Sequence, residues 1–189
     1  MMEEIRQILQ ESIRVKQALL TQASLIQQIA DLLIEALKGG HKILVCGNGG
    51  SAADAQHMVA ELVGRFALER QPFRAIALTT NTSILTALAN DYGYETIFAR
   101  QVKALAEPGD VLVGISTSGN SPNVICAIEA ARAQGAFTIG LTGENGGKLK
   151  DVADLCLCIP SRSTPRIQEA HITVIHILCK LIEEALAER

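Results

Sequence analysis

Aromatic side chains are scarce in this sequence. Only 3% of its 189 residues are Phe, Tyr or Trp, and Trp is absent, whereas 48% are hydrophobic. The core must therefore be built from Ile, Leu, Val and Ala, a composition that suits parallel α/β folds. The length allows one well-buried domain, and we expect residues 1–189 to form a single domain.

Positive charge is also in short supply. The 17 Lys and Arg are outnumbered by 20 Asp and Glu, which gives a net charge of -3. No basic field is available to neutralise a phosphate backbone, so we expect no nucleic-acid partner. No apolar run approaches the roughly 20 residues needed to span a bilayer, so we expect no membrane partner either. Because the mean hydropathy is nevertheless +0.23, the sequence predicts apolar surface buried between the subunits of an oligomer.

Cysteine spacings typical of zinc ribbons or redox motifs are missing. The 5 cysteines are odd in number and form no C-x-x-C pair, which indicates small buried hydrophobes in a reducing compartment. The first residues, MMEEIRQILQ, carry acidic groups where an export signal would carry basic ones. These features predict a cytoplasmic protein.

The sequence is instead rich in apolar residues that alternate between two periods. Helical spacing runs over 3–37 with an interruption near 21–24, so residues 1–40 are predicted to be a helical segment that packs in the oligomer. Residues 41–189 alternate between strands and helices, which predicts an α/β fold with a doubly wound, flavodoxin-like, five-stranded parallel sheet flanked by helices. The predicted strands are 42–47, 74–79, 111–116, 137–142 and 155–160, and the predicted helices are 52–66, 83–105, 123–134, 147–152 and 167–187.

Ligands of such folds collect at the carboxyl ends of the strands, where two loops have an unusual composition. Residues 47–51, GNGGS, lead into a helix whose free N–H groups suit an anion, but a plain tight turn explains this loop equally well. Residues 116–122, STSGNSP, place four hydroxyl groups before another helix. One helix cap needs one hydroxyl, so this loop favours a phosphate monoester over a capped turn.

Two predicted helices carry polar residues that suit a metal ion or proton transfer. His57 and Glu61 lie one turn apart on one face, although a solvated polar face would explain this pair alone. The last helix adds Gln168 and His176, and a histidine between two isoleucines, as His176 is, is expected to be buried with a partner or ligand. Gln168 and His176 are about 12 Å apart along a straight helix, so they share an ion only by leaning together or with help from a neighbouring subunit. For His171 a hydrogen-bonded structural role is favoured.

Together these segments resemble a known family. CGNGGSAADAQHMVAELVGRF (46–66), GDVLVGISTSGNSPNV (109–124) and TPRIQEAHITVIHIL (164–178) are similar to the phosphoheptose isomerases of the sugar isomerase (SIS) family, and the resemblance covers essentially the whole chain. It implies conversion of sedoheptulose 7-phosphate to D-glycero-D-manno-heptose 7-phosphate, the first step toward the ADP-heptose of lipopolysaccharide or related glycans. It also implies a homotetramer with active sites at or near subunit interfaces and one Zn²⁺ per subunit.

The resemblance also implies roles for particular residues. The family's metal ligands fall on His57, Glu61, Gln168 and His176. We expect Glu61 to shuttle the proton and His176 to act as acid and base on the sugar oxygens. Residues 161–165 vary among relatives, and this variation could alter how the edge of the site closes. The substrate-binding positions fall on Asn48, Gly49, Gly50, Ser51, Glu61, Asn90, Asp91, Ser116, Thr117, Ser118, Ser121 and Gln168.

Three other functions stay open at this point. A non-catalytic phosphosugar-binding relative could act as a regulator or as a partner of the replication initiator, but that branch lacks the glutamate found here as Glu61, so the enzyme is favoured. A second alternative keeps the chemistry and changes the sugar, for example to a hexose phosphate. A transcriptional regulator would need a DNA-binding module, and residues 1–40 contain no basic recognition helix.

Overall fold

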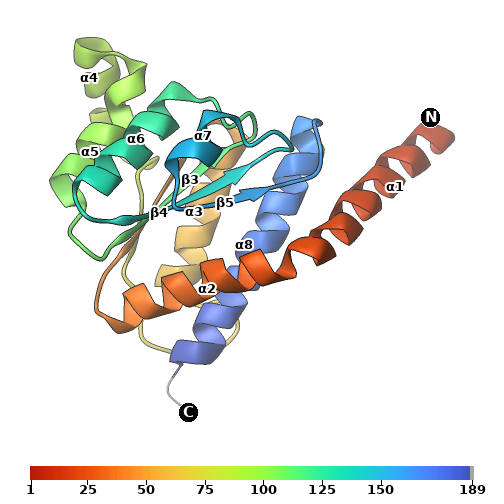
Figure 1. Ribbon diagram of the computed structural model, residues 1–189, viewed down its shortest axis with the longest axis horizontal. Coiled ribbons are helices and arrows are strands. Elements are labelled where there is room, and N and C mark those ends of the chain that lie inside the picture. Colours follow the sequence, from red (N-terminus) through yellow and green to blue (C-terminus); the bar gives the residue numbers. More distant parts are fainter. Residues whose placement is uncertain (188–189) are drawn as a thin grey trace.

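The computed structural model describes residues 1–187, which form an open sheet with helices on both faces (Figure 1). The strands pair in the order β2-β1-β3-β4-β5, and every pair is parallel. The predicted doubly wound, five-stranded sheet is confirmed, and each strand falls within the residues predicted for it. The strands are β1 (Ile43–Gly47), β2 (Ala75–Ala77), β3 (Val111–Ser116), β4 (Phe137–Thr142) and β5 (Leu155–Cys158).

The helices follow the predicted order. Two short 3₁₀ turns accompany them, η1 (Leu19–Gln22), at the interruption expected near 21–24, and η2 (Tyr94–Thr96). The helices are α1 (Met2–Ala18), α2 (Ala23–Lys38), α3 (Gly50–Val63), α4 (Thr82–Tyr92), α5 (Ile97–Leu105), α6 (Pro122–Ala133), α7 (Gly147–Val152) and α8 (Thr164–Leu186).

The prediction of one helix over 83–105 is wrong, because Gly93 divides it into α4 and α5. Gly93 has a φ of 91°, a left-handed conformation that ends a helix and that glycine adopts without strain. Two other boundaries also move. The helix expected to reach residue 66 ends at Val63, and the last helix begins at Thr164, where Pro165 fits the first turn because its missing N–H would have no helical partner there.

The side chains of β1 divide the core into two apolar clusters. Ile43 and Val45 pack with α2, α3 and α8 on one face of the sheet, whereas Leu44 and Cys46 pack with α5, α6 and α7 on the other. Successive side chains of a strand point to opposite faces, and burial on both faces explains the continuous apolar runs seen in the sequence. Of the cysteines expected to be buried, Cys46 and Cys179 are, and the other three are only partly covered.

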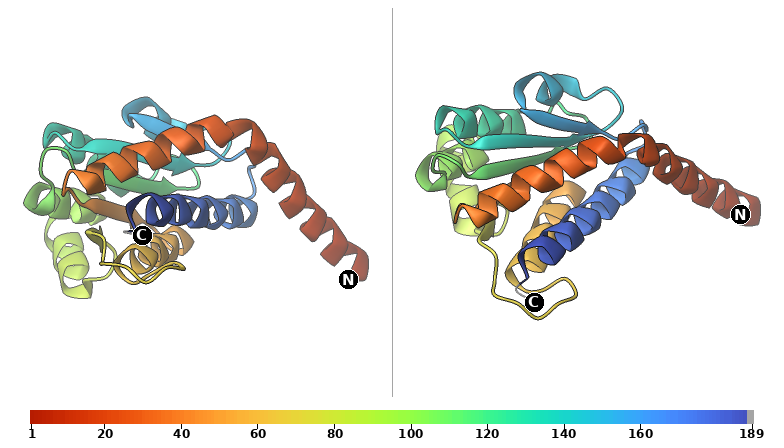
Figure 2. Two further views of the ribbon diagram at one scale, coloured as in Figure 1. Left: turned by 90° about the horizontal axis from the view of Figure 1, so that it is seen from below. Right: turned by 60° about the horizontal axis from the view of Figure 1, so that its bottom comes forward.

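The N-terminal helix α1 extends away from the sheet (Figure 2) and buries none of its residues. Ile5, Ile8, Leu9 and Ile13 are between 45% and 58% exposed along it. The apolar surface expected from the high mean hydropathy is therefore found on α1. None of the helices within residues 1–187 is both long enough and apolar enough to cross a membrane.

Candidate functional site

Two loops lie side by side where the strand order reverses, which is the usual ligand site of an open α/β sheet. β1 pairs with β3, and Gly47 is opposite Ile115, so the loops that follow these strands leave the same edge. The Asn48 and Asn123 amides join the loops, each donating Nδ2–H to the other's Oδ1 at 2.9 and 2.8 Å. The Tyr94 hydroxyl also donates to Asn48 Oδ1, at 3.1 Å. Sequence reasoning missed Asn123 and Tyr94, because no local signal pairs either residue with Asn48.

The glycine loop, residues 47–51, turns tightly into α3. Gly49 is the N-cap residue, and the buried Ser51 donates its backbone N–H to the Asn48 carbonyl at 3.0 Å. Gln168 of α8 lies against Gly50, where a Cβ atom would overlap the Gln168 amide. The backbone geometry is that of a tight turn, one of the two interpretations left open by the sequence, and α8 covers its start.

The serine loop, residues 116–121, holds a cluster of hydroxyl groups. Ser116 Oγ lies 2.9 Å from Ser121 Oγ and 3.4 Å from Ser118 Oγ. Ser121 is the N-cap residue of the 12-residue helix α6, yet its side chain makes no capping hydrogen bond. A capped turn therefore does not account for these hydroxyl groups. Together with the N-terminus of α6 they form a neutral set of donors that suits an anion.

Gly119 gives the serine loop its shape. Its φ is 66°, and a Cβ atom at this position would overlap the carbonyl oxygen of Gly146. The Gly119 carbonyl accepts the backbone N–H of Leu149 at 2.9 Å. The loop is thus pressed against the start of α7, and a side chain at position 119 has no room.

A cavity of about 340 Å³ opens beside the serine loop. Thr117 and Ser118 contribute to its lining, as do Arg162 and Thr164 from the segment 161–165. Arg162 Nε donates to Glu144 Oε2 at 2.6 Å. Residues 161–165 therefore border the cavity that Thr117 and Ser118 also line, and there the Arg162 cation is paired with the Glu144 carboxylate.

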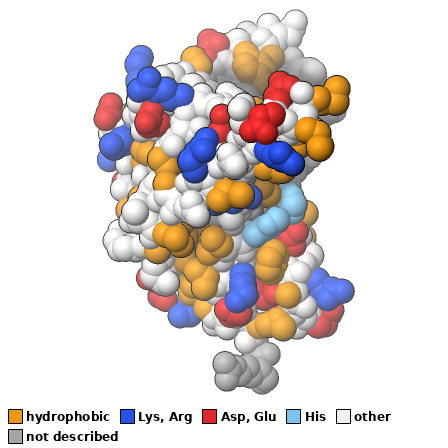
Figure 3. Space-filling model, turned by 90° about the vertical axis from the view of Figure 1, so that its right-hand side faces the viewer, with side chains coloured by type: hydrophobic (Ala, Val, Ile, Leu, Met, Phe, Trp, Pro, Cys, Tyr) orange, Lys and Arg blue, Asp and Glu red, His pale blue; other side chains and the backbone are white. Residues whose placement is uncertain are grey.

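His57 and Glu61 of α3 meet His176 of α8. His57 Nε2 is 3.0 Å from Glu61 Oε1 and 3.3 Å from His176 Nε2, and each residue offers a ligand atom within 4.8 Å of the others. Two imidazole nitrogens and a carboxylate oxygen are donors that Zn²⁺ prefers, so this trio fits a metal ion. Figure 3 shows histidine side chains at the surface beside acidic and apolar groups. His176 is half-buried, not fully buried as expected, because it lies between the buried Ile175 and Ile177, which is 39% exposed. The partner expected for it is present in His57.

Gln168 and the pair Asn90 and Asp91 are the other predicted residues of α8 and α4. Gln168 lies against Gly50, which is about two helical turns before His57 on α3. Asn90 and Asp91 lie at the exposed end of α4, where Asn90 Nδ2 donates to Asp91 Oδ1 at 2.8 Å.

Two further titratable groups lie on the helices of the site. His171 is fully buried with Nε2 3.1 Å from the Thr142 carbonyl oxygen. Burial lowers the pKa of His171 to about 4, so the imidazole is neutral and its predicted structural role is supported. Sequence reasoning missed Asp54, one turn before His57. Burial raises the pKa of Asp54 to about 6, against a smaller opposite effect of His57, and its Oδ2 has no hydrogen-bond partner within residues 1–187.

Comparisons with known proteins show the family and the fold. Residues 7–143 match the SIS domain family. The phosphoheptose isomerase of Aquifex aeolicus is 57% identical over 190 residues, covering 100% of both chains, and that of Geobacter sulfurreducens is 62% identical over 164 residues, covering 87% of each. The structure of the phosphoheptose isomerase from Neisseria gonorrhoeae superposes with a TM-score of 0.92 at 47% identity, covering 97% of this chain and 98% of that one.

The shape of the serine loop can be tested with Gly119→Ala. A left-handed conformation costs a residue with a Cβ atom about 1–2 kcal/mol, and the overlap with Gly146 must displace the loop. We therefore expect weaker binding of inorganic phosphate, measured by calorimetry, together with a lower free energy of unfolding in urea.

Gly135→Ala is the matched control, since Gly135 has a φ of 77° but a Cβ atom there would make only an ordinary van der Waals contact, with Pro108 at 3.4 Å. It should lose stability and keep phosphate binding. Equal phosphate affinity in both variants would contradict the role of the serine loop.

Proposed function

The chain belongs to the SIS domain family, and from this membership we propose that it is an aldose-ketose isomerase that converts sedoheptulose 7-phosphate into D-glycero-D-manno-heptose 7-phosphate. Similarity to phosphoheptose isomerases along the whole chain supports the substrate. The structural observation that carries the proposal is that His57 and Glu61, on the helix that follows the glycine loop, meet His176 of α8. The product would supply the synthesis of ADP-heptose for lipopolysaccharide or related glycans.

The reaction moves one proton between carbon atoms and one between oxygen atoms. In the forward direction the Glu61 carboxylate takes a proton from C1 of the ketose and returns it to C2. His176, 3.3 Å from His57, removes the proton of the C1 hydroxyl and supplies one to the C2 oxygen. The C1–oxygen bond becomes the carbonyl, and no outside oxidant is required.

The phosphate of the substrate anchors the non-reacting end of the sugar. Ser116, Thr117, Ser118 and Ser121 are the proposed phosphate ligands, and this remote binding energy holds C1 and C2 in place. The other proposed substrate contacts are Asn48, Gly49, Gly50, Ser51, Glu61, Asn90, Asp91 and Gln168.

A metal ion is proposed at the trio on α3 and α8. His57, Glu61 and His176 would hold one Zn²⁺ per chain, with Gln168 as a fourth ligand once its amide turns away from Gly50. When bound, Zn²⁺ would polarise the substrate carbonyl as a Lewis acid. Glu61 must then loosen from the metal to act as a base, because a coordinated carboxylate is less basic.

The isomerase assignment is tested by following sedoheptulose 7-phosphate by NMR with the purified protein. The wild type should form the aldose phosphate, and Glu61→Gln should lower kcat by about 10³-fold, because it removes the group that moves the carbon-bound proton. Glu35→Gln, at an exposed glutamate of α2, is the control and should leave kcat unchanged.

A wild-type protein that forms no aldose would refute the assignment. Turnover of a ketohexose phosphate in preference to the heptulose would keep the reaction class and overturn the proposed substrate. A Glu61→Gln variant with normal kcat would remove Glu61 from its role.

The metal assignment is tested by elemental analysis after mild purification. We expect about one Zn²⁺ per chain, loss of activity on chelation and recovery on adding zinc. His57→Ala should bind much less zinc, whereas His41→Ala, at a histidine outside the trio, should bind as the wild type does. Full activity of the metal-free protein would contradict a catalytic metal.

The unpartnered surface of α1 supports a homotetramer. The apolar stripe of α1 continues into an apolar hollow of about 420 Å³ lined in part by Leu19, Leu20, Ile177 and Leu181. This hollow includes a residue next to His176 on α8, so a second copy seated there would lie near the active site. The proposed compartment is the reducing cytoplasm, in keeping with the five free cysteines.

Light scattering during gel filtration tests the assembly. The wild type should have four times the chain mass of 20.2 kDa. The double variant Ile5→Asp, Leu9→Asp should dissociate, because it places charges in the apolar stripe of α1 that the tetramer would bury. Glu4→Gln, on the same helix, should not. A monomeric wild type would refute the tetramer.

A further inference from the structure

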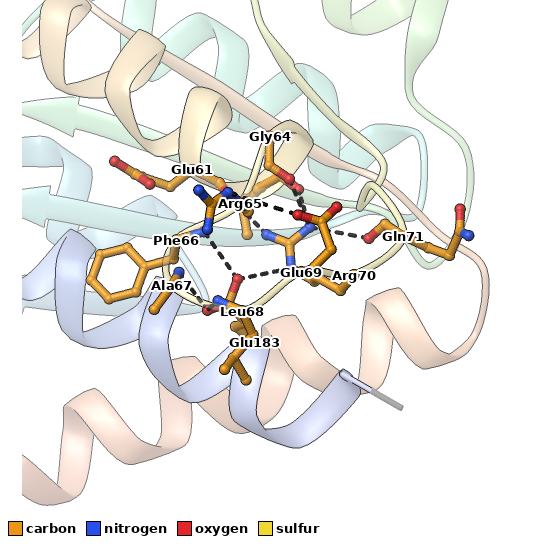
Figure 4. Close-up of polar contacts among 11 residues, drawn as sticks. Glu61, Gly64, Arg65, Phe66, Ala67, Leu68, Glu69, Arg70, Gln71 and Glu183 are labelled. Carbon is orange, nitrogen blue, oxygen red and sulfur yellow. Dashed lines mark hydrogen bonds and ion pairs between the residues drawn. The ribbon is translucent and has the colours of Figure 1, made fainter. Parts of the chain in front are cut away.

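A buried ion pair that belongs to neither the metal trio nor the two loops joins residues 64–71 to α8. Arg70 Nε lies 3.1 Å from Glu183 Oε1, and the two side chains are only 3% and 2% exposed. Glu183 also accepts the backbone N–H groups of Phe66, Ala67 and Leu68 at 2.9, 2.7 and 2.9 Å. Figure 4 shows this carboxylate at the centre of the loop. One side chain of α8 thus holds the whole turn that follows α3.

Arg70, the cation of the pair, binds the C-terminal end of α3. Arg70 donates to the carbonyl oxygen of Glu61 at 2.7 Å through Nη2 and to that of Leu62 at 2.9 Å through Nη1. It also donates to the Gly64 carbonyl, at 3.3 Å. Carbonyl groups in the last turn of a helix lack helical partners, and a cation there is favoured by the helix dipole. Arg70 is therefore a side-chain cap for the turn that contains Glu61.

The same contacts reach His176. Glu183 lies about two turns after His176 on α8. Phe66, whose N–H Glu183 accepts, packs its ring on the His176 ring with the centroids 5.8 Å apart. The Arg70–Glu183 pair is thus connected to both of the proposed reacting groups, to Glu61 through its backbone carbonyl and to His176 through Phe66.

Stability alone does not explain such a pair. Replacing a buried ion pair by apolar residues of similar size is often neutral or stabilising, because burial removes both charges from water. Here both charged side chains bind backbone groups of the turn and of α3 and hold them in place. Each carboxylate oxygen of Glu183 accepts two hydrogen bonds.

We propose that Arg70 and Glu183 are positioning residues that hold α3 and α8 at the spacing at which Glu61 and His176 act together. The proposal rests on the proposed isomerase function. Neither residue contacts the reacting atoms. They act through the Glu61 carbonyl and through Phe66, so their loss changes the spacing of the reacting groups and leaves the serine loop in place.

The test uses the full-length protein with Glu183→Gln and Arg70→Lys. Glutamine keeps the size of Glu183 and loses its charge, and lysine keeps the charge of Arg70 and loses the fork that reaches Glu61 and Leu62. Small displacements in an active site cost about 10²-fold in rate, so we expect kcat to fall by that order with KM little changed. Zn²⁺ affinity, measured against a coloured chelator, should fall by about tenfold or more, as for other residues behind metal ligands.

Asp110→Asn is the matched control. Asp110 is also a buried carboxylate that accepts two backbone N–H groups, from Lys42 and Glu107, and pairs with a cation, Lys42 Nζ at 2.7 Å. It precedes β3, at the opposite end of the sheet from the serine loop. Its loss should lower the urea midpoint as Glu183→Gln does, with wild-type kcat and Zn²⁺ affinity.

Equal kcat and Zn²⁺ affinity in Glu183→Gln and Asp110→Asn would overturn the proposal and leave the pair a structural one. If Glu183→Gln does not fold, Arg70→Lys decides, and normal kcat and zinc affinity in that variant would overturn the proposal too. A wild type without isomerase activity would refute the proposed function instead, and the zinc measurements would still decide whether the pair positions the trio.

Discussion

The pairing of β1 with β3 is the contact on which the site depends. It places Gly47 opposite Ile115, so the glycine and serine loops leave the sheet together. The register is specified twice. A shift of one residue would send Ile43 and Val45 away from their apolar cluster, and it would also part Asn48 from Asn123. Because burial and the polar contact favour the same register, the anion site follows from the way the core packs.

A second contact, between α3 and α8, brings together the proposed reacting groups. Helical period alone places His57 and Glu61 on one face, whereas His176 joins them because α8 packs on the same side of the sheet. The Nε2 atoms of His57 and His176 lie 3.3 Å apart beside the Glu61 carboxylate, and at most one proton fits between the two nitrogens. The three groups therefore cannot satisfy all of one another's hydrogen-bonding capacity. Groups held in this way in a folded chain indicate a ligand or a reaction rather than a contribution to stability.

The fold was more predictable from the sequence than the details of the site. The buried parallel strands and the serine loop each have a distinctive composition over a few consecutive residues, so they can be recognised directly in the sequence. The break at Gly93 was missed because apolar periodicity continues across it, and only the left-handed φ of 91° reveals the turn. The contacts of Asn48 with Asn123 and of Arg70 with Glu183 join residues 75 and 113 positions apart. No local pattern encodes such pairs, because they form only when elements distant in the sequence pack together.

The two ends of the site are held in place by different elements of the fold, and this difference bears on the proposed chemistry. The serine loop is held by β3, α6 and the start of α7, with Gly119 against Gly146. Glu61 and His176 are held by α3, α8 and the turn that Glu183 binds. In the proposed reaction, a substrate that spans both ends would be bound through its phosphate by the serine loop, while proton transfer would depend on the pair of helices α3 and α8. Because the proton must move through distances of a hydrogen bond, the spacing of that helix pair is the more demanding of the two constraints. In keeping with that difference, the proposed phosphate end is built from several hydroxyl groups, whereas Glu61 and His176 lie near a buried ion pair in which each carboxylate oxygen of Glu183 accepts two hydrogen bonds.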